Sequence, residues 1–256
     1  MSTLSRMWKR LWNSHSNLSF HAAMVTNFCS ERDQESRSSQ EKKFIDIVNT
    51  VLRCHDGTNL KQFKVAFELR KKNGYSLDNW IGFAVSSHAS EIVLDLDPKS
   101  PRTAQDAYDF PFHLFQSENS IHSVWVKCVS LKAPPYFNGF TKLTRLTISS
   151  VHAPEDIGNM FSNCCSLKWL HIVCCNFGKE LKLHGTFYRL QYLCVIYSEV
   201  QAIELHAIDL VTFKYMGQPL PIVFYESPKL KVANIKLCPY YHLEYICSGL
   251  STALLV

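Results

Sequence analysis

The 256-residue chain is 46% hydrophobic and only 19% charged, a composition typical of a folded chain with a sizeable core and not of a disordered one. Its 27 Lys and Arg against 22 Asp and Glu give a formal net charge of +5, an excess too small to indicate nucleic-acid binding. No apolar run follows the basic residues near the N-terminus, so we expect neither a signal peptide nor a membrane span. A reducing compartment, cytoplasmic or nuclear, follows, and disulfides between the ten cysteines are not expected.

The first predicted element is an amphipathic helix within residues 4–20. Its apolar face recurs at i, i+4, i+7 and i+8 and consists of Leu4, Trp8, Leu11 and Trp12. Residues 29–43 are charged and serine-rich without an apolar period, and we expect a linker over 21–43.

Helical and strand patterns alternate over the next fifty residues. A helix is predicted over 44–52 and a second one over 77–85, and each is followed by a segment that alternates as a strand does. The two helical faces carry Phe44, Ile47, Val48 and Val51, then Leu77, Trp80, Ile81 and Ala84; the strands carry Phe63, Val65 and Phe67, then Ile92, Leu94 and Leu96. This succession fits a curved solenoid.

From residue 121 onward, one apolar pattern repeats six times. Apolar residues stand at offsets 0, 3 and 5, and in several frames at 8, from Ile121, Leu143, Leu167, Leu190, Leu210 and Leu230. These positions are 22, 24, 23, 20 and 20 residues apart, which is typical of leucine-rich repeats. Offsets 3 and 5 share one face of a short strand, and each repeat returns on the outer side. We therefore predict an α/β leucine-rich-repeat solenoid over 44–256, with a curved parallel sheet and helices and loops outside it.

The stretch CCSLKWLHIVCC at 164–175 holds four of the ten cysteines. Zinc is one interpretation, because it binds four thiolate or imidazole ligands, but the usual Cys-x-x-Cys spacing is absent. Cys175 stands at offset 8, where this repeat type places Asn or Cys under the turn that leaves the strand. We therefore expect buried cysteines and no metal ligands, with a zinc protein as the alternative.

The sequence offers no catalytic constellation. It contains no phosphate-binding glycine loop, no His-Glu-x-x-His segment and no Gly-x-Ser-x-Gly segment. Asp95 and Asp97 alternate on a strand without the further oxygen ligands that Ca²⁺ needs. We expect no enzyme activity and no cofactor.

Residues at offsets 2, 4 and 6 should face outward on the concave side of the sheet. They include Ser123, Thr147, Ser149, Val173, Cys194, Ile196 and Lys236, and the candidate partner-binding residues Trp125, Lys127, Arg145, Trp169, His171, Tyr192 and Lys214. Exposed aromatic clusters are typical of interfaces, and the neighbouring basic residues favour an acidic partner. Alternatively, the rings are covered by the N-terminal helix or by neighbouring side chains.

The order of these motifs resembles the plant F-box proteins with a leucine-rich-repeat region. The resemblance is carried by residues 44–65, 77–85, 110–151 and 160–175, and includes the connection PPYFNGF at 134–140. Residues 4–20 are similar to the last helix and exit of an F-box, and the F-box in this family docks a Skp-type adaptor of a cullin ubiquitin ligase. Leu4, Trp8, Leu11 and Trp12 would then be the remnant of that adaptor-binding surface, or alternatively an apolar cap on the first repeat.

This resemblance implies a substrate-recognition module that binds a protein and performs no chemistry itself, with no nucleic-acid or membrane partner. Because the sequence starts with only the last F-box helix, a scaffold or competitor without ligase recruitment is the alternative.

Overall fold

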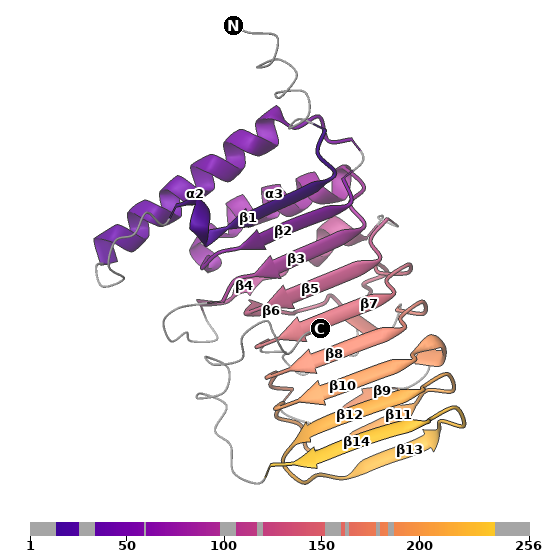
Figure 1. Ribbon diagram of the computed structural model, residues 1–256. Helices are drawn as coiled ribbons and strands as arrows, with labels where there is room; N and C mark the ends of the chain where they lie inside the picture. The colour runs from indigo at the N-terminus through magenta and orange to yellow at the C-terminus, as the bar shows by residue number, and fades with distance from the viewer. Residues whose placement is uncertain are drawn as a thin grey trace, which may run out of the picture.

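The computed structural model in Figure 1 describes residues 14–25, 34–58, 60–97, 106–116, 120–151, 160–161, 164–177, 180–183 and 187–238, with side chains from residue 37 onward in the first helix. In this part of the chain the main sheet has nine parallel strands that stack in chain order. They are β1 (Asn17–His21), β2 (Gln62–Ala66), β3 (Glu91–Asp95), β5 (Ser123–Lys127), β7 (Arg145–Ser149), β8 (Trp169–Val173), β10 (Tyr192–Ile196), β12 (Thr212–Gly217) and β14 (Val232–Leu237).

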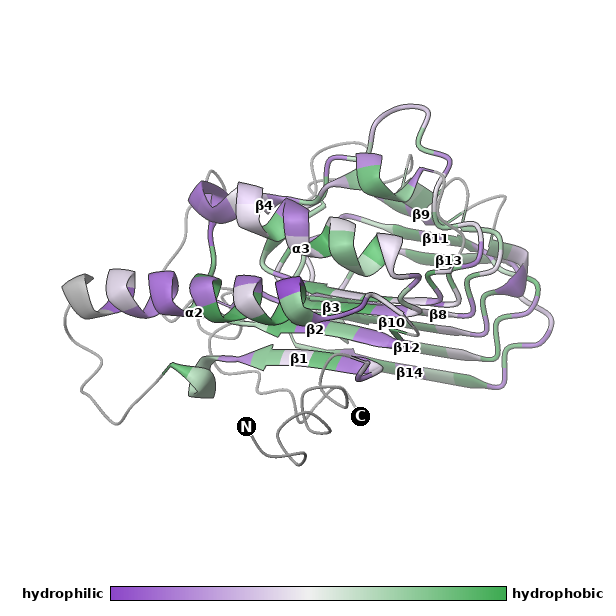
Figure 2. Cartoon of the chain, turned by 90° about the horizontal axis from the view of Figure 1, so that it is seen from above, coloured by the Kyte–Doolittle hydropathy of each residue, from purple (hydrophilic) through white to green (hydrophobic). Residues whose placement is uncertain are grey.

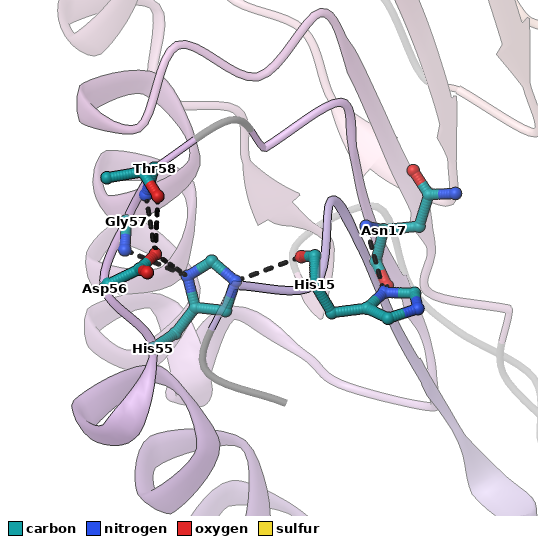
Figure 3. A network of polar contacts seen from close by, with 6 residues as sticks. All are labelled: His15, Asn17, His55, Asp56, Gly57 and Thr58. Carbon is teal, nitrogen blue, oxygen red and sulfur yellow. Dashed lines mark hydrogen bonds and ion pairs between the residues drawn. The ribbon is translucent and has the colours of Figure 1, made fainter. Parts of the chain in front are cut away.

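A second layer lies along one face of this sheet, as Figure 2 shows for α3 and the short strands. It contains the helices α2 (Gln34–Cys54) and α3 (Gly74–Ser86) and two smaller parallel sheets, β13-β11-β9 and β4-β6. The short strands are β4 (Tyr108–Asp109), β6 (Val129–Ser130), β9 (Leu181–Leu183), β11 (Ile203–His206) and β13 (Ile222–Glu226). The short 3-10 helices are η1 (Ala22–Met24), η2 (Lys71–Asn73), η4 (Phe112–Phe115) and η5 (Phe187–Arg189). None of the helices in the described ranges is both long and apolar enough to cross a membrane.

The core lies between the two layers and consists of the residues that the repeat pattern selects. In β7, for example, Leu146 and Ile148 at offsets 3 and 5 are completely or almost completely buried, as is Leu143 at offset 0. The six predicted frames coincide with β5, β7, β8, β10, β12 and β14, which confirms the solenoid. The last frame differs in one respect: Ile235 of β14 is 47% exposed, because β14 is the edge strand of the described sheet.

Four consecutive strands of the main sheet, β5, β7, β8 and β10, end in the same turn at offset 7. The residues there, Cys128, Ser150, Cys174 and Tyr197, have φ angles of 59°, 49°, 51° and 47°, in the left-handed region. The backbone N–H of each donates to the carbonyl at offset 6 of the next strand, for example from Ser150 to Val173 at 2.8 Å. This bond satisfies the backbone where the chain leaves the main sheet for the second layer.

The N-terminal region departs from the sequence prediction. The linker expected over 21–43 is wrong for 34–43, which form the first half of α2, and residues 17–20, at the end of the F-box-like stretch, belong to β1. In both views the first half of α2 extends beyond the strands, where it has no core to pack against, and its residues are mostly polar. Apolar packing of α2 begins only at Phe44. Leu18 and Phe20 bury β1 against the core. The predicted helix with Leu4, Trp8, Leu11 and Trp12 lies outside the described residues.

Candidate binding face

The face of the main sheet opposite to the core carries the side chains at offsets 2, 4 and 6, and we call it the polar face. The strands pair in exact register, so equal offsets line up in three rows across the sheet. Across β7, β8, β10 and β12 the rows are Arg145, Trp169, Tyr192 and Thr212; Thr147, His171, Cys194 and Lys214; and Ser149, Val173, Ile196 and Met216.

Four of the predicted site residues form one continuous stack on this face. The rings of Trp169 and Tyr192 lie parallel, with centroids 4.5 Å apart and planes inclined by 20°. The guanidinium of Arg145 lies 5.5 Å from the centroid of Trp169, and the ammonium of Lys214 lies 5.5 Å from the centroid of Tyr192. Cation–π attraction and ring stacking therefore hold these four side chains in place, and we call them the cation–aromatic stack.

The stack combines exposed charge with a partly exposed ring. Arg145 and Lys214 are exposed, and Trp169 is 44% exposed. Among the described residues, neither cation forms an ion pair with an acidic side chain. Burial, together with the neighbouring Cys194, raises the pKa of Tyr192, so its hydroxyl stays protonated at neutral pH. The stack thus presents positive charge without a neutralising group in the described part of the chain.

His171 lies one row along from the stack, on β8, between Thr147 and Cys194. Its Nε2 atom is buried and has no hydrogen-bond partner within the described ranges. Burial and the positive charge of Lys214 both lower the pKa of His171, so the imidazole is neutral at neutral pH. It therefore contains an unsatisfied polar atom that is buried near the ammonium of Lys214.

Lys127 lies in the offset-6 row of this face, next to Ser149, but its side chain is not available to a partner. Its side chain is only 10% exposed, and its ammonium pairs with the carboxylate of Asp97. Burial lowers the pKa of Lys127, but the hydrogen bond and the charges of Asp97 and Asp95 outweigh it and raise the pKa overall. The prediction that Lys127 binds a partner is therefore not supported. The two aspartates were visible in the sequence. The sequence did not show that β3, which Asp97 follows, pairs with β5, the strand of Lys127.

Trp125 lies apart from the stack, on β5, and is partly buried between Val93 and Thr147 in its row. Three further residues predicted to face outward are covered by their neighbours: Ser149 and Val173 are each 6% exposed and Cys194 only 2%. The sequence analysis thus identified all four members of the stack but could not show that their side chains touch. The available signal was that Arg145, Trp169 and Tyr192 share offset 2 in three consecutive frames.

The two cysteine pairs of the 164–175 stretch lie before and after β8, a strand that spans roughly 16 Å. Cys164 and Cys175 are completely buried, and their thiols donate to the backbone carbonyls of Met160 and Val173. Opposite ends of a strand cannot ligate one ion, so this geometry does not fit the zinc alternative. In the described part of the chain, no three His, Cys, Asp or Glu side chains are grouped as metal ligands.

The chain is similar in sequence to known leucine-rich-repeat proteins. The profile of a family described as "At1g61320/AtMIF1, LRR domain" matches residues 51–254. The F-box/FBD/LRR-repeat protein At4g00160 of Arabidopsis thaliana is 26% identical over 175 residues, which are 67% of this chain and 35% of the relative. The F-box/FBD/LRR-repeat protein At3g52680 of the same plant is 24% identical over 172 residues, with 67% and 34% covered. The matched region is thus about a third of the length of each relative. No solved structure matches this chain significantly.

Proposed function

The chain belongs to the At1g61320/AtMIF1 leucine-rich-repeat domain family, and from this premise we propose that its polar face binds a protein substrate. The observation that carries the proposal is the cation–aromatic stack. Arginine and aromatic side chains are enriched at the centres of protein interfaces, where they supply most of the binding energy. The stack keeps Trp169 and Arg145 in fixed positions, which reduces the entropy that binding would cost.

We further propose that this binding serves ubiquitin transfer in the cytoplasm or nucleus. The curated relatives are named as F-box proteins, and the resemblance of residues 4–20 to an F-box helix implies a Skp-type adaptor. The module would hold the substrate near a conjugating enzyme and raise the effective concentration of the substrate's lysines. The chain itself performs no chemistry in this proposal, so partner capture is the activity to measure.

Substrate capture is tested by affinity enrichment from plant cells with three forms of the chain. Trp169→Ala removes the exposed ring of the polar face, whereas Tyr188→Ala removes a ring that is 60% exposed on η5, outside the main sheet. Partners retained by wild type and by Tyr188→Ala, but lost by Trp169→Ala, are the expected result. Equal retention by all three forms would refute binding through the polar face.

Ligase recruitment needs a separate test. The chain is co-expressed with a Skp-type adaptor, beside Trp8→Ala/Trp12→Ala and beside a fusion to the complete F-box of At4g00160. Retention of the adaptor by the chain, lost in the double variant, would support recruitment through the helix predicted from Leu4, Trp8, Leu11 and Trp12. Retention by the fusion alone would support the alternative, a scaffold or competitor without ligase recruitment.

A further inference from the structure

Resting on the proposed function, we infer that the cation–aromatic stack recognises an acidic segment of the protein partner, with one carboxylate on Arg145 and a second on Lys214. The segment would run across the strands from β7 to β12. The inference names the chemistry of the partner at this site, which the family assignment leaves open.

The charge of the polar face supports an acidic partner. From β7 to β14, the three rows contain the cations Arg145, Lys214 and Lys236, all exposed, and no acidic residue. The acidic residues of this face lie at the other end, where Glu91 accepts a hydrogen bond from Gln62, and Asp95 and Asp97 face Lys127. Unneutralised positive charge is therefore concentrated where the aromatic rings are.

The geometry of the stack sets the spacing of the carboxylates. Arg145 is on β7 and Lys214 is on β12, three strand spacings apart, or about 14 Å. An extended segment rises about 3.3 Å per residue, so acidic residues four positions apart match this span. We therefore expect the pattern Asp/Glu-x-x-x-Asp/Glu.

The same stack disfavours a nucleobase as the ligand. Trp169 has Arg145 on the strand at one side and Tyr192 on the strand at the other, and Tyr192 lies in the same way between Trp169 and Lys214. Both faces of both rings are therefore occupied, and a base could stack only by displacing one of these groups. The ring edges remain for apolar side chains, and the N–H donors of both cations remain for carboxylates.

His171 lies one row along from Trp169 and Tyr192, and its Nε2 atom is buried without a partner among the described residues. Because this atom is closed to solvent, a bound segment reaches it only if the imidazole ring turns outward, so the carboxylate contacts are assigned to Arg145 and Lys214 alone. The charge distribution, the spacing of the two cations and the occupied ring faces point to one segment that crosses β7, β8, β10 and β12.

The test selects peptides from a random 12-residue phage library on the purified chain and measures the affinity of the selected peptides by fluorescence anisotropy. Arg145→Glu/Lys214→Glu reverses the two charges. Arg145→Gln/Lys214→Gln removes both positive charges without introducing negative ones. Lys42→Glu/Lys43→Glu makes the same charge change on exposed positions of α2. Wild type should enrich paired acidic residues four positions apart. The reversal should weaken their binding about tenfold or more, and the α2 control should leave it within about twofold.

Selection of neutral or basic peptides, or of none, would overturn the inference, as would a 12-nucleotide RNA that displaces the selected peptides and loses affinity in the reversed variant. Two failures remain distinguishable. Non-acidic peptides that are lost with Trp169→Ala would refute the acidic segment but retain protein binding by this face. Peptides indifferent to Trp169→Ala would refute both.

Discussion

Trp169 and Trp80 show how one residue type serves two purposes in this chain. Trp80 of α3 is 1% exposed and its indole N–H donates to Asn49 of α2 at 2.7 Å, which ties the two helices together. Trp169 lies on the polar face, where its ring contacts Arg145 and Tyr192. Burial assigns the first to the core and the second to a binding surface.

Replacing each tryptophan with alanine should reduce the stability of the fold by different amounts. Trp80→Ala removes a buried ring and leaves Asn49 unpaired, so we expect a loss of about 3–5 kcal/mol of unfolding free energy. Trp169→Ala should cost less than about 1.5 kcal/mol, because it removes only a stacking contact and a cation–π contact. Urea denaturation followed by circular dichroism measures both. A loss of folding with Trp169→Ala would make that ring part of the core.

Adjacent cysteines should differ sharply in reactivity. Cys164 is completely buried and burial raises the pKa of its thiol to about 12, whereas Cys165 is exposed. Only thiolates react with iodoacetamide, so Cys165 should be alkylated in the folded chain and Cys164 only after unfolding. Peptide mass spectrometry after brief labelling measures the two sites. Equal labelling of both would contradict the structural placement of this pair.

His171 should make the fold sensitive to acid. Burial and Lys214 lower its pKa in the folded state, so the unfolded chain binds the proton first as the pH falls below the ordinary histidine value of about 6.5. The stability is fully present above that value and declines below it. Beside His171 in its row lie Thr147, which has no titratable group, and Cys194, whose thiol pKa is raised by burial. Thermal unfolding from pH 7.5 to 5 should therefore show a smaller decline for His171→Gln than for wild type, and equal declines would refute the assignment.

At the scale of elements, the connection PPYFNGF between β6 and β7 packs into a cluster of phenylalanines. Phe110, Phe112, Phe115, Phe137 and Phe140 contact one another, with ring centroids between 4.9 and 6.3 Å apart. The cluster supports the β5–β7 part of the sheet from the second layer. Gly139 lies within it, and a Cβ there would be 2.6 Å from the carbonyl oxygen of Phe115 and 2.5 Å from the ring of Phe137.

Two glycine-to-alanine changes should therefore act in opposite directions. Gly139→Ala requires the chain of Phe115 or the ring of Phe137 to move, and we expect it to destabilise the fold by about 1–3 kcal/mol. Gly82→Ala lies inside α3, where the new Cβ meets only Leu114 at 4.0 Å, so we expect about 0.5–1 kcal/mol of stabilisation from helix propensity. Midpoints of chemical denaturation measure both. The same sign for the two changes would contradict this packing.

For the whole molecule, the repeat pattern predicted the main sheet because each frame carries its own buried residues. Leu146 and Ile148, for example, reach the core from their own strand, and the next frame repeats the same arrangement. The first half of α2 escaped prediction because it has no apolar face. Sequence reasoning also missed β1, where only Leu18 and Phe20 mark the strand, and the pairing of Lys127 with Asp97, which depends on two elements meeting in space.

Contacts between strands on the polar face could not be predicted from the sequence either. Offsets identified Arg145, Trp169, Tyr192 and Lys214 one by one, since side-chain alternation is a local property. Their contact depends on the exact register between β7, β8, β10 and β12. The spacing of the frames along the sequence does not determine this register. The burial of Cys194 and Val173 likewise depends on neighbouring strands.

The central claim is that the polar face, at the cation–aromatic stack, holds a protein partner. Its most direct test places a photo-crosslinking amino acid at Thr147, which lies beside the stack on β7, and at Tyr188 on η5 as the control, followed by irradiation in plant cells. We expect discrete protein adducts from position 147 that disappear when Arg145 and Lys214 are reversed to glutamate, and none of these from position 188. Adducts of the same proteins from position 188, or adducts at 147 that survive the charge reversal, would contradict it.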